Sequence, residues 1–187
     1  QCVGLLHDWT NFGNDANLPP HSGDGYIGMI TYDDLNQREY AYSTLSSPLV
    51  AGTEYCVSFW MLSGYADFSS TAYTDNIGIY ISSAFPDAGG GGMNTAPWTV
   101  TPQVYSTSTV PTGSWVQISG TYIATGGEQY ITLGNFFNNG ATTVVANGAA
   151  QMGARAVAGS MENGGMNPEP GTIGTVREER AARSKER

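Results

Sequence analysis

The chain has 187 residues, a formal net charge of −9 and only 12% charged residues, together with 25 glycines and 11 tyrosines. An average soluble protein has about 25% charged residues, so hydroxyl and amide groups rather than ions solvate most of this surface. Residues 1–150 contain eleven acidic residues and one basic residue, Arg38, which gives a net charge of −10. A phosphate backbone repels such a domain, so we expect no nucleic-acid partner.

The composition also indicates where the protein works. Few charges with many Ser, Thr, Gly, Asn and Tyr residues are typical of secreted β-rich proteins, so we expect an exported protein, extracellular or on the outer cell surface. The chain starts at Gln1, which we interpret as the start of a processed or truncated product. No stretch approaches the ~18–20 consecutive apolar residues of a membrane span, so we expect no membrane insertion.

The two cysteines, Cys2 and Cys56, allow one intramolecular pairing. In an exported protein this disulfide would close a loop of about 55 residues and stabilise the fold by about 4 kcal/mol in the chain-entropy model. The alternative is that Cys56, inside an apolar strand, is a buried thiol and that Cys2 pairs elsewhere.

After an irregular, turn-rich segment at 1–25, the chain alternates in the two-residue period of strands. The strands predicted from this pattern cover 26–32, 38–45, 54–62, 75–82, 100–105, 114–124, 128–137 and 142–146. Segment 54–62 is apolar on both faces, which predicts a central strand covered on both sides. We therefore assign Phe59 and Trp60, and also Trp115 of a later strand, to the core.

Two connections stand out. Residues 83–99 form a loop with four consecutive glycines, longer than an ordinary hairpin needs, so we expect it to be flexible or functional. Residues 125–137 begin with a glycine turn that leads into a strand.

About eight short strands and no convincing amphipathic helix before residue 150 predict an all-β protein. The simplest architecture is a jelly-roll β-sandwich of antiparallel strands, with an immunoglobulin-like sandwich as the alternative. We place this domain at 1–148. Residues 149–187 show no strand periodicity and end in mixed charges, so we predict a low-complexity tail there, disordered or extended.

Several segments resemble, in order, one known module. They are His21–Tyr32, Arg38–Tyr40, Ser47–Phe59, Asp75–Tyr80 and Gly126–Phe136. The module is a galactose-binding-like jelly roll of Bacteroidetes secreted and cell-surface proteins, often attached to OmpA-like or gliding-associated domains. The likeness covers roughly residues 20–146 and implies a carbohydrate-binding or adhesive role.

Both ends of the chain depart from that module. Its members usually open with an Asn-Pro-Ser-Phe-Glu-like strand and close with a Tyr-Ile-Asp-Asp-Val-like strand, and this sequence shows neither. Missing strands would leave sheet edges exposed. Three explanations stay open: a fragment, a shifted reading frame behind the tail, or a protomer whose edges neighbouring copies complete.

The resemblance also implies a structural Ca²⁺. Asp24 lies in Ser-Gly-Asp-Gly, where resembling modules often hold an ion, and is our candidate ligand; the alternative is a turn residue that tolerates left-handed backbone. In related jelly rolls, carboxylates of the end strands also bind the ion, and those strands are the ones that this sequence lacks.

No catalytic pattern stands out. The sequence has no Gly-X-Ser-X-Gly, no His-Glu-X-X-His and no paired Cys-X-X-Cys motif. A glycoside hydrolase needs two carboxylates about 5–9.5 Å apart. Glu54, Glu128, Asp67 and Asp75 offer pairs, but nothing in the sequence singles one out.

For sugar binding, an exposed aromatic plane beside amides or carboxylates is needed. Tyr65 and Asp67 in one loop, Tyr73 and Asp75 after it, and Trp98 in the glycine-rich loop fit that requirement. The alternative is that these aromatic rings only pack within their loops.

The sequence therefore favours a non-catalytic extracellular or cell-surface binding or adhesion module. Its expected partner is a glycan or another cell-surface polymer. A structural subunit that self-assembles through incomplete β-edges is the alternative, and a glycan hydrolase is the third hypothesis.

Overall fold

The computed structural model describes residues 21, 27–63, 72–87, 96–111, 114–146, 154–158 and 174–175. Within these residues the chain is all-β, as predicted, with one 3-10 helix, η3 (Asn139–Ala141), as its only helical element. In these residues there is no helix that is long and apolar enough to cross a membrane.

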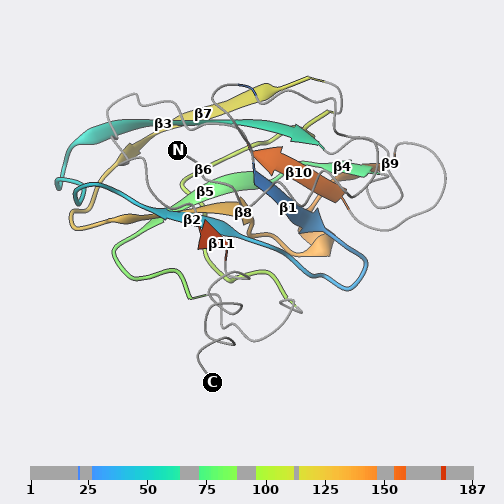
Figure 1. Cartoon of the computed structure of the whole chain (residues 1–187), viewed down its shortest axis with the longest axis horizontal. Helices are drawn as coiled ribbons and strands as arrows, with labels where there is room; N and C mark the ends of the chain where they lie inside the picture. Colours follow the sequence, from blue (N-terminus) through green and yellow to red (C-terminus); the bar gives the residue numbers. More distant parts are fainter. Residues whose placement is uncertain are drawn as a thin grey trace.

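The strands form two layers (Figure 1). The six-stranded sheet has, in spatial order, β7 (Val116–Ile123), β3 (Glu54–Ser63), β10 (Ala154–Ala158), β4 (Ala72–Thr74) and β9 (Val144–Ala146), with β1 (Ile27–Tyr32) also paired with β10. The five-stranded sheet has the order β11 (Gly174–Thr175), β2 (Ala41–Thr44), β8 (Tyr130–Asn135), β5 (Ile77–Ser82) and β6 (Val104–Tyr105). Neighbouring strands run antiparallel except β10 and β4, which are parallel.

The core lies between the two sheets and follows from the two-residue alternation. Val57, Phe59 and Met61 of β3 are buried there against the other layer. Ile77, Ile79 and Ile81 lie on the inner face of β5, as the sequence predicts. Each fully buried side chain of this kind contributes about 1.5–3 kcal/mol relative to an exposed one.

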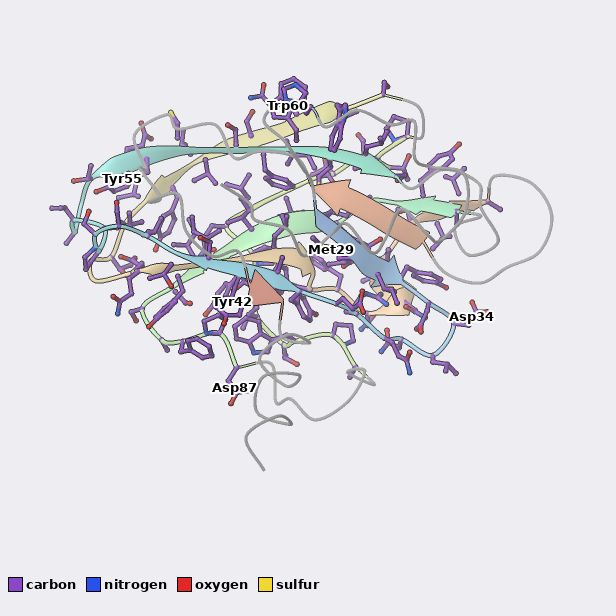
Figure 2. All side chains as sticks on the ribbon, viewed as in Figure 1. Met29, Asp34, Tyr42, Tyr55, Trp60 and Asp87 are labelled. Atoms are coloured by element: carbon purple, nitrogen blue, oxygen red, sulfur yellow. The ribbon has the colours of Figure 1, made fainter. Side chains whose placement is uncertain are left out.

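The prediction that both faces of 54–62 are covered is wrong for most of the strand, although Leu62 on its outward face is buried. β3 does lie between β7 and β10, but its outward residues include exposed Glu54 and Cys56 and half-exposed Trp60. Trp115 is also half-exposed. Figure 2 shows Trp60 above the six-stranded sheet, on the side away from the other layer. Strand alternation gives which residues share a face, but not whether a further layer covers that face.

The predicted boundary at residue 148 does not coincide with the end of the sheets. β10 lies beyond that boundary and pairs with both β1 and β3. Its Ala-Arg-Ala-Val-Ala sequence is short and carries no polar–apolar alternation to mark it as a strand. β11, further along the same segment, pairs with the edge of β2.

Other strands differ from prediction mainly in their bounds. β2 and β6 are shorter than the segments 38–45 and 100–105 from which we predicted them. β4 lies between the predicted strands 54–62 and 75–82, where we predicted no strand. The glycine turn at the start of 125–137 is confirmed, because Gly126 and Gly127 have φ of 101° and 87°, in the region that glycine favours.

Candidate functional site

The outer face of the five-stranded sheet carries a group of aromatic side chains. The inner positions of its strands hold the core isoleucines and leucine, so the alternate residues point outward. Across one row, Tyr42 of β2 and Tyr80 of β5 flank Thr132 of β8. We call five of the half-exposed or exposed rings on this face the aromatic surface; they are Tyr42, Tyr80, Phe85, Trp98 and Tyr130.

Tyr40 supports this surface from below. A glycine is required at position 134, because a Cβ there would collide with the Tyr40 ring. The Tyr40 hydroxyl donates to the backbone oxygen of Asn135 at 3.1 Å and accepts from the backbone N–H of Trp98 at 2.8 Å. Burial raises the pKa of Tyr40 to about 12. This neutral, buried phenol therefore ties the Trp98 segment to the sheet.

Trp98 packs on rings from three segments of the chain. Its centroid lies 5.1 Å from that of Tyr80 with planes at 80°, and 6.3 Å from that of Tyr40 with planes at 75°. Phe136, buried at the end of β8, lies 6.2 Å away. Edge-to-face contacts of this kind are favourable beyond the area that they bury, so the indole is held in a fixed orientation while part of it stays exposed.

Phe85 extends the aromatic surface over the other end of the row. Its ring makes T-shaped contacts with Tyr42 at 5.2 Å and with Tyr130 at 5.6 Å. At 45% exposure it is the most open ring of the group. Asp87 follows two residues later, and Figure 2 shows it beyond Tyr42 on the side away from the six-stranded sheet. A carboxylate thus accompanies the rings.

One polar atom on this face is unusual. Thr132 is 1% exposed, and its Oγ1 has no hydrogen-bond partner among the described residues. Burying a hydroxyl without a partner costs about 1–3 kcal/mol. Tyr42 and Tyr80 therefore flank a hydroxyl whose burial is unfavourable.

An array of this kind has the chemical groups that a sugar ligand needs. Partly exposed aromatic planes stack against the apolar C–H faces of sugar rings, and neighbouring hydroxyls and carboxylates bind the sugar hydroxyls. Of the predicted ligand residues, Trp98 belongs to the array. Sequence reasoning missed Tyr42, Tyr80, Phe85 and Tyr130. The available signal was that Tyr42 and Tyr80 alternate with inward-facing small or isoleucine residues.

The other predicted ligand residues do not join Trp98. Tyr73 is half-buried in β4 of the six-stranded sheet, whereas Trp98 packs on the five-stranded sheet. The Asp75 carboxylate accepts the backbone N–H of Thr143 at 2.8 Å, so it stabilises the approach of that segment. Tyr65 and Asp67 lie outside the described residues.

Glu128, a candidate carboxylate for hydrolysis, accepts hydrogen bonds from the turn in which it lies. Its Oε1 accepts from the Tyr122 hydroxyl and from the hydroxyl and N–H of Thr125 at 2.6–2.7 Å, and its Oε2 accepts from Gly126 N–H at 2.8 Å. Burial raises the pKa of this carboxyl, but the hydrogen bonds from Thr125 and Tyr122 outweigh burial and hold the pKa at about 2. Such a carboxylate has no proton to donate near neutral pH.

The remaining candidates concern metal and disulfide. The described part of the chain has no group of three or more His, Cys, Asp or Glu side chains placed to hold a metal ion, and Asp24 lies outside it. The Cys56 thiol is exposed, so the interpretation of a buried thiol is wrong. Cys2 lies outside the described residues, and its pairing with Cys56 stays a prediction.

Comparisons with known proteins do not assign the chain to a family. No protein-family model, no curated protein and no solved structure matches it.

Proposed function

We propose that this chain is an exported, non-catalytic binding or adhesion module that works at the cell surface or outside the cell and binds carbohydrate. We also propose that its fold is a jelly-roll β-sandwich of the galactose-binding-like kind that the sequence resembles; the two-layer, mainly antiparallel arrangement of strands supports this. The module binds its glycan on the aromatic surface of the five-stranded sheet.

The observation that carries this proposal is the fixed, partly exposed indole of Trp98 within the aromatic surface. Soluble proteins seldom leave several large rings together on one face unless that face binds something. Here the rings are oriented by edge-to-face contacts and by the Tyr40 hydroxyl. A preorganised aromatic plane loses little conformational freedom when a sugar stacks on it.

Charge supports a neutral ligand. Residues 1–150 carry a net charge of −10, which repels anionic polymers at low ionic strength. A neutral polysaccharide or the glycan of a cell-surface polymer is therefore the partner that we propose.

Affinity electrophoresis in native gels that contain neutral soluble polysaccharides tests this function. We expect retarded migration of the wild type in at least one polysaccharide, and at least a tenfold loss of affinity in Trp98→Ala. The bond to Tyr40 uses the backbone of Trp98, so this variant keeps that support. Leu35→Ala, which removes an exposed apolar side chain elsewhere, is the matched control. Unchanged affinity in Trp98→Ala would contradict the proposal.

A structural subunit that self-assembles is the second candidate, and β7 favours it. This eight-residue strand lies at the edge of the six-stranded sheet and contains neither a charged residue nor proline. Natural proteins usually protect such an edge with those residues. Sedimentation velocity at increasing protein concentration tests the idea: a monomer throughout the range rules it out.

A further inference from the structure

We propose that the outer face of β3 and β7, on the side of the molecule opposite the aromatic surface, is a second binding surface for an extended, neutral glycan chain. The inference shares its ligand class with the proposed function and rests on it to that extent. It uses a different sheet and different residues, so the two can fail separately.

The first argument is the chemistry of this face. The inner residues of the two strands, such as Phe59 and Ile118, belong to the core, so the alternate residues point outward. In register across the pair, Trp60 lies opposite Gln117, and Ser58 lies opposite Ser119. All four are exposed or half-exposed. Amide and hydroxyl groups beside an indole are what a polyhydroxylated ligand needs.

The second argument is the indole of Trp60, which already holds a ring. The imidazole of His21 stacks on it with centroids 3.8 Å apart and planes at 17°. Trp115 lies edge-on to the same imidazole at 6.1 Å. A nearly parallel ring at van der Waals distance occupies the place that the face of a pyranose ring would take. His21 therefore competes with a sugar for Trp60.

Two unused polar atoms mark the same place. Within the described part of the chain, Trp60 Nε1 and His21 Nδ1 are both buried without a hydrogen-bond partner. A buried indole N–H without an acceptor costs about 1–3 kcal/mol. A sugar that displaces the imidazole supplies hydroxyl oxygens near this N–H, whereas the imidazole itself, stacked face to face, supplies none.

The third argument is the length and charge of the face. From Trp60 to Glu54, at the far end of β3, six residues span about 20 Å at ~3.3 Å per residue, roughly four pyranose units. Glu54 is the only charged residue that the two strands contain. A second copy of this acidic chain would meet charge repulsion here, which favours a neutral glycan over self-association.

Isothermal titration calorimetry with neutral oligosaccharides of two to six units tests the inference. The oligosaccharides come from whichever soluble polysaccharide (β-glucan, galactomannan, xyloglucan or dextran) retards the wild type in native gels. In a Trp98→Ala background, we expect binding to persist and affinity to rise up to about four units. Adding Trp60→Ala should then lower affinity at least tenfold, whereas adding His21→Ala should raise it several-fold.

If Trp60→Ala fails to fold, Gln117→Ala tests the same surface, because Gln117 is exposed and lies directly opposite Trp60. We expect this variant to lose affinity several-fold. If Trp98→Ala alone removes all binding, the proposed function stands and the second surface does not exist. The inference is also overturned if the wild type and His21→Ala bind none of the polysaccharides, or if Trp60→Ala changes only the sedimentation coefficient.

Discussion

The carboxylate of Glu128 shows how one side chain fixes a turn between two strands. It is 3% exposed and accepts four hydrogen bonds from groups within six residues of it. Two of the donors are backbone N–H groups, one of them on Gly126, whose positive φ turns it toward the carboxylate. The turn that leads into β8 therefore depends on a charge rather than on apolar packing.

We expect Glu128→Gln to lower the free energy of unfolding by about 1–3 kcal/mol, because an amide turns at least one acceptor into a donor that faces other donors. The folded pKa of about 2 lies below the ordinary carboxyl value. The stabilisation is therefore fully present above about pH 4.5 and is lost as pH falls through 2.

Urea unfolding of the two proteins between pH 7 and pH 2 measures the difference. It should be constant at higher pH and shrink below pH 4.5. Glu54→Gln, at an exposed position, is the control and should show little difference at any pH. A gap between wild type and Glu128→Gln that does not change with pH would rule out the ionised carboxylate as its source.

At this scale the sequence allowed only part of the site to be predicted. Trp98 could be nominated because a tryptophan in a loop has few apolar partners nearby in sequence. The hydrogen bond from Thr143 to the Asp75 carboxylate could not be predicted, since the two residues are 68 positions apart and meet only in the folded chain. Residue type shows what a side chain can bind, but the fold decides whether that capacity is already used.

Among the elements, β8 links the aromatic surface to the core. Its inward residues Ile131 and Leu133 are buried between the sheets, and its outward face holds Thr132 and Gly134. Because Gly134 has no side chain, the Tyr40 ring can occupy the space beside it. The position of Trp98 thus depends on a glycine in a strand, where glycine is otherwise unfavourable.

We expect Gly134→Ala to lower the free energy of unfolding by about 1–3 kcal/mol, since the added methyl group must displace the Tyr40 ring. It should also weaken glycan binding, because Tyr40 no longer holds the backbone of Trp98 in place. Chemical denaturation and native-gel retardation measure the two effects. In the control Gly140→Ala, the new Cβ meets only Asn138 Oδ1 at 3.5 Å, so both quantities should stay near wild type. Equal behaviour of the two variants would contradict this role of Tyr40.

The elements show where strand prediction succeeds. Segments such as Ile77–Ser82, with isoleucine at every second position, were predicted because burial on one face imposes that period. β4 and β10 were not, because they have only three and five residues and no alternation. Such strands are defined by the partners on either side of them, which the local sequence does not contain.

For the whole molecule, residues beyond 148 complete the six-stranded sheet. β10 lies between β1 and β3, so the sheet depends on a segment that the sequence assigns to a tail. The interpretation that incomplete edges await neighbouring copies loses its support at this position, since the chain itself supplies a strand there. Among the described strands of this sheet, β7, β9 and β1 each pair with one neighbour only.

We expect a chain that ends at residue 148 to be much less stable than one that ends at residue 160. Without β10, the paired edges of β1 and β3 lose their hydrogen bonds and become open to other chains. Thermal unfolding followed by circular dichroism, with light scattering for aggregation, compares the two. Equal midpoints and equal solubility would show that the sheet does not need β10.

The position of β10 also governs the order in which the protein can fold. Ile27 of β1 is aligned with Ala158, 131 residues later in the chain, and pairings so distant in sequence make folding slow. During synthesis, β1 has to wait for this partner until residues 154–158 have emerged. The six-stranded sheet therefore cannot close before β10 is available to pair with β1 and β3.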